Sequence, residues 1–368
     1  MTAIAKSLKL IAVITAITFV CACNKGGWEF QTGEKVRSSP TISGRYVYIG
    51  STDNKLYCLN AATGEKVWEF AAGDQVNSSP AVTGGYVYVG SNDRNVYCLN
   101  AATGVKIWEF VTGATVQSSP AISGGYVYVG SGDGNVYCLN AATGEKSWEF
   151  ATERFVNTPP VVFNGYVYVG SADNKLYCLN AATGEKVWEF ISDNHIVSSP
   201  AISGEYVYVG SDDRNVYCLN AATGKKIWEF TTEDFVRSSP AVCNGFVYVG
   251  SGSVNGLIYC LDAATGQKVW EFATGDRVIS SPAVTCGYVY VGSFDKKLYC
   301  LKATSGEKVW EFATGGWVFS SPVVSNGYVY AGSDDGKVYC LKAARGDRGS
   351  WPMLKYNLER TGAVKLKY

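Results

Sequence analysis

The hydrophobic residues of this chain fall into short runs separated by turn-forming residues, and the same order of runs returns about every 40 residues. In the copy over residues 71–110, four apolar or aromatic runs follow one another: Val76–Thr83, Tyr86–Ser91, Val96–Ala101 and Lys106–Phe110. The repeats carry no apolar residues at helical spacing over about 11 residues. Each copy therefore predicts four β-strands and no helix.

The tripeptide Trp-Glu-Phe marks the repeats. It starts at Trp28, Trp68, Trp108, Trp148, Trp188, Trp228, Trp270 and Trp310, and Trp351 takes the next tryptophan position without Glu-Phe. The spacing is 40 residues throughout, except for 42 before Trp270 and 41 before Trp351. Nine tryptophans enclose eight intervals, so the region from Trp28 to Trp351 contains eight copies of one repeat unit.

The second run of each unit favours a ring of blades. Tyr86-Val87-Tyr88-Val89 is apolar on both faces of a strand, and a sheet that is apolar on both faces must be covered on both. We therefore predict an all-β, eight-bladed β-propeller with four antiparallel strands per blade. Trp28-Glu29-Phe30 precedes the first unit and is expected to supply the outer strand of the last blade, whose other strands lie at about 318–343. The segment around Trp351 competes for that position.

The segment from Cys58 to Trp68, CLNAATGEKVW, carries a family resemblance. It resembles the tryptophan-docking motif of quinoprotein-like (PQQ-type) repeats: Thr63, Gly64 and Trp68 match, Cys58 replaces an alanine and Asn60 an aspartate. The resemblance implies a propeller in which these positions hold neighbouring blades together. The docking residues that it implies are Trp68, Trp108, Trp148, Trp188, Trp228, Trp270, Trp310, Gly64, Gly104 and Gly144.

Composition narrows the function. Lys+Arg and Asp+Glu are both 32, only 17% of residues are charged and 14% are aromatic. This excludes a disordered chain and argues against a nucleic-acid binder. The single histidine weakens metal and acid–base chemistry, so we expect no catalytic residues, no metal and no cofactor. The Ser-x-Asp stretches, such as Ser51-Thr52-Asp53, are interpreted as hairpin turns rather than calcium loops.

Most of the 12 cysteines follow the repeat. Equivalent positions on packed sheets lie about 10 Å apart, too far for a disulfide, which needs Cα atoms within about 7 Å. We expect free thiols at Cys58, Cys98, Cys138, Cys178, Cys218, Cys260, Cys300 and Cys340. Cys243 and Cys286 fall in the first hairpin loop of consecutive blades. The sequence leaves both alternatives for this pair, a disulfide or two free thiols.

The N-terminal segment reads as an export signal. Lys6 and Lys9 precede the uncharged run Leu10–Val20, which suits a signal-peptide core and is too short to span a bilayer. The sequence Val20-Cys21-Ala22-Cys23 resembles a bacterial lipobox, which implies acylation of Cys23; ordinary secretion is the alternative. The expected divisions are a signal peptide (1–22), an anchor and linker (23–27), the propeller (28–351) and a tail (352–368).

The loops after Trp-Glu-Phe and after Gly-Ser vary most between copies, and both are expected on one face of the ring. At one register, just before Ser-Ser-Pro, they carry Arg37, Asn77, Gln117, Asn157, Val197, Arg237, Ile279 and Phe319. Arginine and aromatic side chains are typical interface anchors. The candidate partner-binding residues are Arg37, Phe155, His195, Phe235, Arg237, Trp317 and Phe319.

The chain is thus interpreted as a non-catalytic scaffold, anchored by lipid and monomeric, which binds protein at the membrane. It resembles the propeller lipoproteins of the outer-membrane β-barrel assembly machinery. The resemblance implies a role in outer-membrane protein assembly and a location at the outer membrane, on either its periplasmic or its surface face. Two other interpretations stay open: a cell-surface binding or adhesion module, and a quinone-dependent dehydrogenase.

Overall fold

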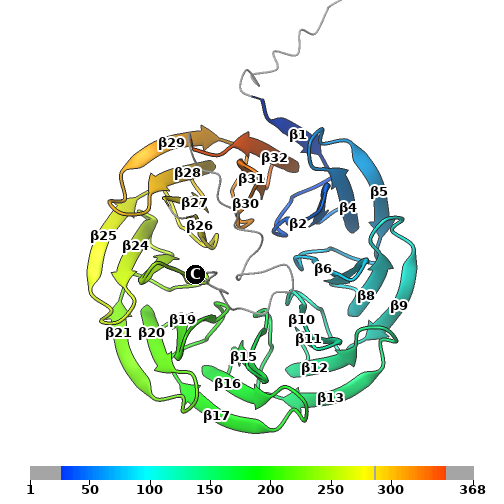
Figure 1. Cartoon of the computed structure of the whole chain (residues 1–368), viewed down its shortest axis with the longest axis horizontal. Helices are drawn as coiled ribbons and strands as arrows, with labels where there is room; N and C mark the ends of the chain where they lie inside the picture. The colour runs from blue at the N-terminus through cyan, green and yellow to red at the C-terminus, as the bar shows by residue number, and fades with distance from the viewer. Residues whose placement is uncertain (1–25, 286, 345–368) are drawn as a thin grey trace, which may run out of the picture.

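The computed structural model of the chain describes residues 26–285 and 287–344, and in these ranges it is a closed β-propeller (Figure 1). Thirty-two strands form eight four-stranded antiparallel sheets, the blades, around a central axis. The predicted fold class is therefore confirmed. Within the same ranges, no helix is long and apolar enough to cross a membrane.

Blades are numbered in chain order, from blade 1 (β2–β5) to blade 8 (β30, β31, β32 and β1). The innermost strands are β2 (Thr41–Ser43), β6 (Ala81–Thr83), β10 (Ala121–Ser123), β14 (Val161–Phe163), β18 (Ala201–Ser203), β22 (Ala241–Cys243), β26 (Ala283–Val284) and β30 (Val323–Ser325). The second strands are β3 (Tyr46–Gly50), β7 (Tyr86–Gly90), β11 (Tyr126–Gly130), β15 (Tyr166–Gly170), β19 (Tyr206–Gly210), β23 (Phe246–Gly250), β27 (Tyr288–Gly292) and β31 (Tyr328–Gly332). The third strands are β4 (Lys55–Asn60), β8 (Asn95–Asn100), β12 (Asn135–Asn140), β16 (Lys175–Asn180), β20 (Asn215–Asn220), β24 (Leu257–Asp262), β28 (Lys297–Lys302) and β32 (Lys337–Lys342). The outer strands are β5 (Lys66–Ala71), β9 (Lys106–Val111), β13 (Lys146–Ala151), β17 (Lys186–Ile191), β21 (Lys226–Thr231), β25 (Lys268–Ala273), β29 (Lys308–Ala313) and β1 (Trp28–Gln31).

The N-terminus closes the ring, as the sequence predicts. Strand β1 pairs antiparallel with β32, with Trp28 opposite Cys340 and Gln31 opposite Lys337. In Figure 1 the blue β1 lies beside the red-brown β32. The first strand of the chain thus completes the last blade, while the competing segment around Trp351 lies outside the described residues.

The innermost strands are shorter than their sequence pattern predicts. Strand β6 covers Ala81–Thr83, although the apolar run begins at Val76. Pro80 has no N–H for a ladder bond, and Ser78 uses its hydroxyl to accept a hydrogen bond of 3.1 Å from the Gly90 N–H. The Ser-Ser-Pro step is therefore a loop that leads into each blade.

Neighbouring blades meet through the tryptophan of the repeat. The Trp68 indole donates a hydrogen bond of 3.0 Å to the Ala101 carbonyl of the next blade, and its ring packs on Gly104, which has φ +72°. The Tyr48 hydroxyl donates to the same carbonyl at 3.1 Å. The same indole bond joins Trp28 to Ala61, Trp108 to Ala141, Trp148 to Ala181, Trp188 to Ala221, Trp228 to Ala263 and Trp270 to Ala303.

The repeat cysteines lie inside the blades, in the third strands. Cys58 is fully buried, and burial raises the pKa of its thiol to about 12. The other seven, from Cys98 to Cys340, are at most 1% exposed. They pack as small apolar groups among the tyrosines and valines of the core. Cys243 is half-buried at the end of β22, and Cys286 lies outside the described residues.

The Ser-x-Asp turns are held in place by hydrogen bonds to their aspartate carboxylates. Asp93 follows Ser91 between β7 and β8 and accepts hydrogen bonds from the Tyr97 hydroxyl (2.7 Å), the Gly73 N–H (2.6 Å) and the Asn95 N–H (2.9 Å). Asp53, Asp133, Asp173, Asp213, Asp295 and Asp335 likewise accept from a tyrosine four residues on. The interpretation of these stretches as turns is confirmed.

Candidate functional site

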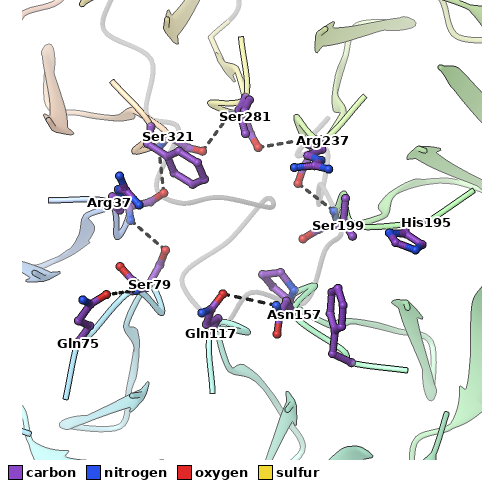
Figure 2. Close-up of a pocket in the computed structure, with 18 of the residues that line it drawn as sticks. Arg37, Gln75, Ser79, Gln117, Asn157, His195, Ser199, Arg237, Ser281 and Ser321 are labelled. Carbon is purple, nitrogen blue, oxygen red and sulfur yellow. Dashed lines mark hydrogen bonds between the residues drawn. The ribbon is translucent and has the colours of Figure 1, made fainter. Parts of the chain in front are cut away.

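The two variable loops of each unit meet around the propeller axis on one face of the ring, which we call the mouth. They surround a cavity of about 580 Å³. All eight residues of the register before Ser-Ser-Pro line it: Arg37, Asn77, Gln117, Asn157, Val197, Arg237, Ile279 and Phe319. Figure 2 shows the labelled side chains of this set arranged around the opening. The repeat architecture thus gathers its least repetitive residues in one place.

A ring of serines lies two residues after this register in sequence, and all of its members except Ser119 line the cavity. The Ser39 N–H donates to the Ser79 hydroxyl of the next blade at 2.9 Å, and the Ser321 N–H donates across the closure to Ser39 at 3.0 Å. Equivalent bonds run from Ser79 to Ser119, from Ser199 to Ser239, from Ser239 to Ser281 and from Ser281 to Ser321. The ring is interrupted at blade 4, where Pro159 replaces the serine and has neither an N–H nor a hydroxyl.

Amide side chains line the mouth over blades 2 to 4. The Asn77 Nδ2 donates to the Gln75 Oε1 at 3.2 Å, and the Asn157 Nδ2 donates to the Gln117 Oε1 at 3.4 Å (Figure 2). Asn92 also lines the cavity. We call Gln75, Asn77, Asn92, Gln117 and Asn157 the amide arc. Their side chains are uncharged, so this part of the mouth is polar without a net charge.

The two arginines of the mouth are each held by a carboxylate of the preceding blade. Arg37 donates to both oxygens of Asp334 at 3.0 and 2.8 Å, and Arg237 donates to both oxygens of Asp212 at 2.9 Å. The hydrogen bond to the carboxylate, partly offset by burial, raises the pKa of each guanidinium. Each bidentate pair cancels one positive charge at the rim of the cavity.

Aromatic side chains gather on the opposite part of the rim from blade 7 to blade 1. Trp317 stacks on Phe294 with ring centroids 4.9 Å apart, and Phe319 lies 6.0 Å from Phe294. The Arg37 guanidinium lies 5.8 Å from the centroid of the Phe319 ring. Trp317 is 44% exposed and Phe319 38%. We call Phe294, Trp317, Phe319 and Arg37 the aromatic crest.

Five of the seven candidate partner-binding residues line the cavity: Arg37, Phe155, His195, Arg237 and Phe319. The other two adjoin it. Phe235 lies under the Arg237 guanidinium, 4.7 Å from it, and Trp317 packs on Phe294. Phe155 and His195 face each other edge-on, with ring centroids 6.2 Å apart.

The sequence patterns place Asp212 and Asp334 only in Ser-x-Asp turns, as in Ser211-Asp212-Asp213, and do not mark Asn92 or Phe294. All four occupy the same position after Gly-Ser in their units, where the other units have Thr52, Gly132, Ala172 and Gly252. Variation at that position was the available signal. The lipidation candidate Cys23 and the tail after residue 344 lie outside the described residues.

Two family models match this sequence, each over about half of it. One is described as the β-propeller of the beta-alanine-activating enzyme and matches residues 14–204. The other is described as outer membrane protein assembly factor BamB, of the PQQ type, and matches residues 177–253 and 254–362. The chain belongs to the PQQ-type β-propeller repeat family. No curated protein matches the sequence.

Solved structures share the fold of this chain at low sequence identity. BamB from Moraxella catarrhalis is 20% identical, with a TM-score of 0.73 over 86% of this chain and 97% of that chain. The computationally designed protein Ika8 is 16% identical, with a TM-score of 0.77 over 85% of this chain and 97% of its own. The quinohemoprotein alcohol dehydrogenase from Comamonas testosteroni is 15% identical, with a TM-score of 0.74 over 90% and 78%.

The dehydrogenases among PQQ-type propellers make quinone and calcium the groups to test against these residues. The resemblance to them implies adjacent cysteines and a set of carboxylate and amide ligands. In residues 26–285 and 287–344, no cluster of three or more His, Cys, Asp or Glu side chains could hold a metal ion. Asp212 is the one carboxylate among the described residues that line the cavity, and Arg237 engages it; Asp334, which does not line the cavity, is engaged by Arg37. The residues of the mouth therefore do not fit these groups.

Proposed function

We propose that this chain is a non-catalytic, membrane-anchored scaffold that binds a protein partner through the mouth face of its propeller, in the assembly of outer-membrane proteins. The observation that carries the proposal is the aromatic crest. Trp317, Phe319 and Arg37 come from two neighbouring blades and form one patch at the edge of the cavity, in which both aromatic rings are exposed and Arg37 is half-buried. Tryptophan and arginine dominate the binding energy of protein interfaces.

The crest is preorganised for binding. Phe294 supports the Trp317 ring from one side, and Asp334 fixes the Arg37 guanidinium with two hydrogen bonds. Binding of a partner would therefore cost little conformational entropy in these side chains, because they are already ordered. The indole and the phenyl ring would supply apolar contact area.

The similarity to BamB supports the cellular setting. The matching family model and one of the similar solved structures are both described as BamB, and the former description names outer membrane protein assembly. We carry that setting over to this chain as part of the proposal. Acylation of Cys23 would hold the propeller at the membrane, where two or more acyl chains make anchoring stable.

Affinity capture from membranes tests the proposal. The full chain is expressed in a bacterium with an outer membrane, captured from detergent-solubilised membranes, and its partners are identified. We expect components of the β-barrel assembly machinery with the unaltered chain and at least a tenfold loss with Trp317→Ala/Phe319→Ala. Val105→Ala is the matched control, because Val105 is exposed but follows the Asn-Ala-Ala-Thr-Gly turn at the other end of its blade.

Two outcomes contradict the proposal. One is a capture that contains no barrel-assembly component. The other is an unchanged capture after the crest is removed. Cys23→Ser separates the anchor from the interface, because it should release the chain from membranes while purified propeller still binds the partner.

A further inference from the structure

We propose that the amide arc and the serine ring form a binding subsite for a neutral saccharide. This inference goes beyond the scaffold role, because it concerns a different ligand and amide side chains from blades outside the aromatic crest. The arc spans blades 2 to 4, whereas the aromatic crest spans blades 7, 8 and 1. The cavity volume of about 580 Å³ lies within the range of small-molecule sites.

Unpartnered amide oxygens are the first observation. In the described part of the chain, five buried side-chain oxygens have no hydrogen-bond partner: those of Asn77, Asn92, Asn95 and Asn157 (Oδ1) and of Ser253 (Oγ). Three of the five, from Asn77, Asn92 and Asn157, belong to residues that line the cavity. Buried polar atoms without a partner are uncommon in folded proteins and cost stability. These oxygens are buried in the free chain although their residues line the cavity. Rotation of each amide group about its Cβ–Cγ bond would turn the oxygen toward the cavity, where a ligand that donates hydrogen bonds would satisfy it.

The serine ring supplies the complementary groups. The hydroxyl oxygens of Ser39 and Ser79 each accept an N–H from a neighbouring blade, and a hydroxyl has a proton to donate as well. The cavity thus offers acceptors on the amide arc and donors on the serines. Hydroxyl groups match both, because each one donates and accepts through the same atom. A hydroxyl also satisfies either end of an amide side chain.

The charges of the cavity argue against an ionic ligand. Its lining contains two guanidinium groups, and carboxylates hold both at 2.8–3.0 Å. An anion would have to compete with Asp212 and Asp334, and a cation would meet Arg37 and Arg237. A neutral ligand avoids both costs.

Aromatic rings border the cavity on two sides. Phe155 is 39% exposed and lies two residues before Asn157 in sequence, and Phe319 lies on the crest side. The apolar C–H face of a sugar ring can pack on such a ring while its hydroxyls reach the amides. A saccharide has hydroxyl groups, which both donate and accept, at its edge and an apolar C–H face. An extended peptide differs, because its N–H groups only donate and its C=O groups only accept.

Calorimetric titration of the full chain tests the inference, with maltotriose and N,N′-diacetylchitobiose as probes. We expect one of the two to bind, and Asn77→Ala/Asn157→Ala to weaken its affinity at least tenfold. Asn95→Ala is the matched control: its Oδ1 is also unpartnered, but Asn95 does not line the cavity. Phe155→Ala is a second variant, at an exposed position, and should weaken binding without lowering the melting temperature.

Three results overturn the inference. The first is no binding of either probe at millimolar concentration, and the second is binding that survives both cavity variants. The third is an uncharged Gly-Ser-Asn peptide that binds with the expected variant pattern while the saccharides do not, which assigns the arc to peptide. Trp317→Ala keeps the two proposals apart, because Trp317 does not line the cavity. It should weaken capture of the protein partner and leave probe binding unchanged.

Discussion

The Trp68 indole of blade 1 donates a hydrogen bond of 3.0 Å to the Ala101 carbonyl of blade 2. In blades 1 to 7, the turn after the third strand receives the tryptophan of the preceding blade in this way. The close fit requires glycine: a Cβ at Gly104 would lie 2.7 Å from the Trp68 ring. The same relation recurs at Gly64 with Trp28 and at Gly144 with Trp108. The turn between the third and outer strands of one blade is thus also the surface on which the tryptophan of the preceding blade packs.

Gly104→Ala should therefore destabilise the propeller more than an alanine at another glycine of positive φ. Gly84 is the matched control, with φ +57° and nothing within 4 Å of an added Cβ. Gly84→Ala should cost only the left-handed backbone strain of about 1–2 kcal/mol, whereas Gly104→Ala adds about 1–3 kcal/mol of overpacking against the indole. Urea unfolding followed by tryptophan fluorescence measures both. Equal losses would show that the tryptophan contact does not require glycine.

The interrupted serine ring gives a second matched pair. The Ser79 hydroxyl accepts the buried Ser39 N–H at 2.9 Å, so Ser79→Ala leaves that N–H unpaired at a cost of about 1–3 kcal/mol. The residue one blade before Ser199 is Pro159, which has no N–H to offer. Ser199→Ala should cost less than Ser79→Ala in the free energy of unfolding. The reverse order in urea titrations would mean that the ring contributes nothing.

The repeat made most of the fold predictable. The tryptophan spacing set the number of blades, and the unpaired Trp28-Glu29-Phe30 indicated how the ring closes. The short innermost strands were not predictable from hydrophobicity alone, because Val76 is buried without belonging to a strand. At the mouth, the register before Ser-Ser-Pro could be read from variation between copies. The pairing of Arg237 with Asp212 could not, because it joins loops of different blades whose distance only the closed ring defines.

The turn held by Asp93 predicts a loss of stability in acid. Burial raises the pKa of Asp93, but hydrogen bonds from Tyr97, Asn95 and Gly73 lower it more, so the folded pKa lies below the ordinary value. A depressed carboxyl pKa stabilises the fold fully above the unfolded value of about 4, and the contribution disappears as the pH falls through the folded pKa. Asp93→Asn should remove this dependence. The difference in unfolding free energy between the unaltered chain and Asp93→Asn should shrink between pH 5 and pH 2; a constant difference contradicts the assignment.

The repeat cysteines should be unreactive in the native protein. Burial raises the pKa of Cys58, Cys98, Cys138, Cys178, Cys218, Cys260 and Cys340 to about 12. At pH 8 only about 10⁻⁴ of each thiol is then ionised, and the thiolate is the reactive form. Labelling with iodoacetamide, read by peptide mass spectrometry, should leave these residues unmodified until urea is added. Rapid native labelling of Cys58 would contradict this burial.

The two arginine–aspartate pairs of the mouth should respond unequally to the loss of either partner. In the pair of Arg237 and Asp212, the arginine side chain is 47% exposed and the aspartate side chain only 8%. Asp212→Asn leaves a guanidinium that water can solvate, so it should cost under about 1 kcal/mol. Arg237→Ala leaves the nearly buried Asp212 carboxylate without its arginine partner. A second basic group near it is the His195 Nδ1, at 4.0 Å. That variant should cost about 1–3 kcal/mol.

The second pair sharpens this prediction, because it differs in one neighbour. Lys35 lies 3.9 Å from Asp334 and remains when Arg37 is removed. Arg37→Ala should therefore destabilise the chain less than Arg237→Ala, although both arginines make the same bidentate contact. Lys35→Ala combined with Arg37→Ala should bring the loss up to that of Arg237→Ala. Urea titrations of the four variants at low salt measure these differences, and a larger loss for Arg37→Ala than for Arg237→Ala would show that Lys35 does not compensate the stranded charge.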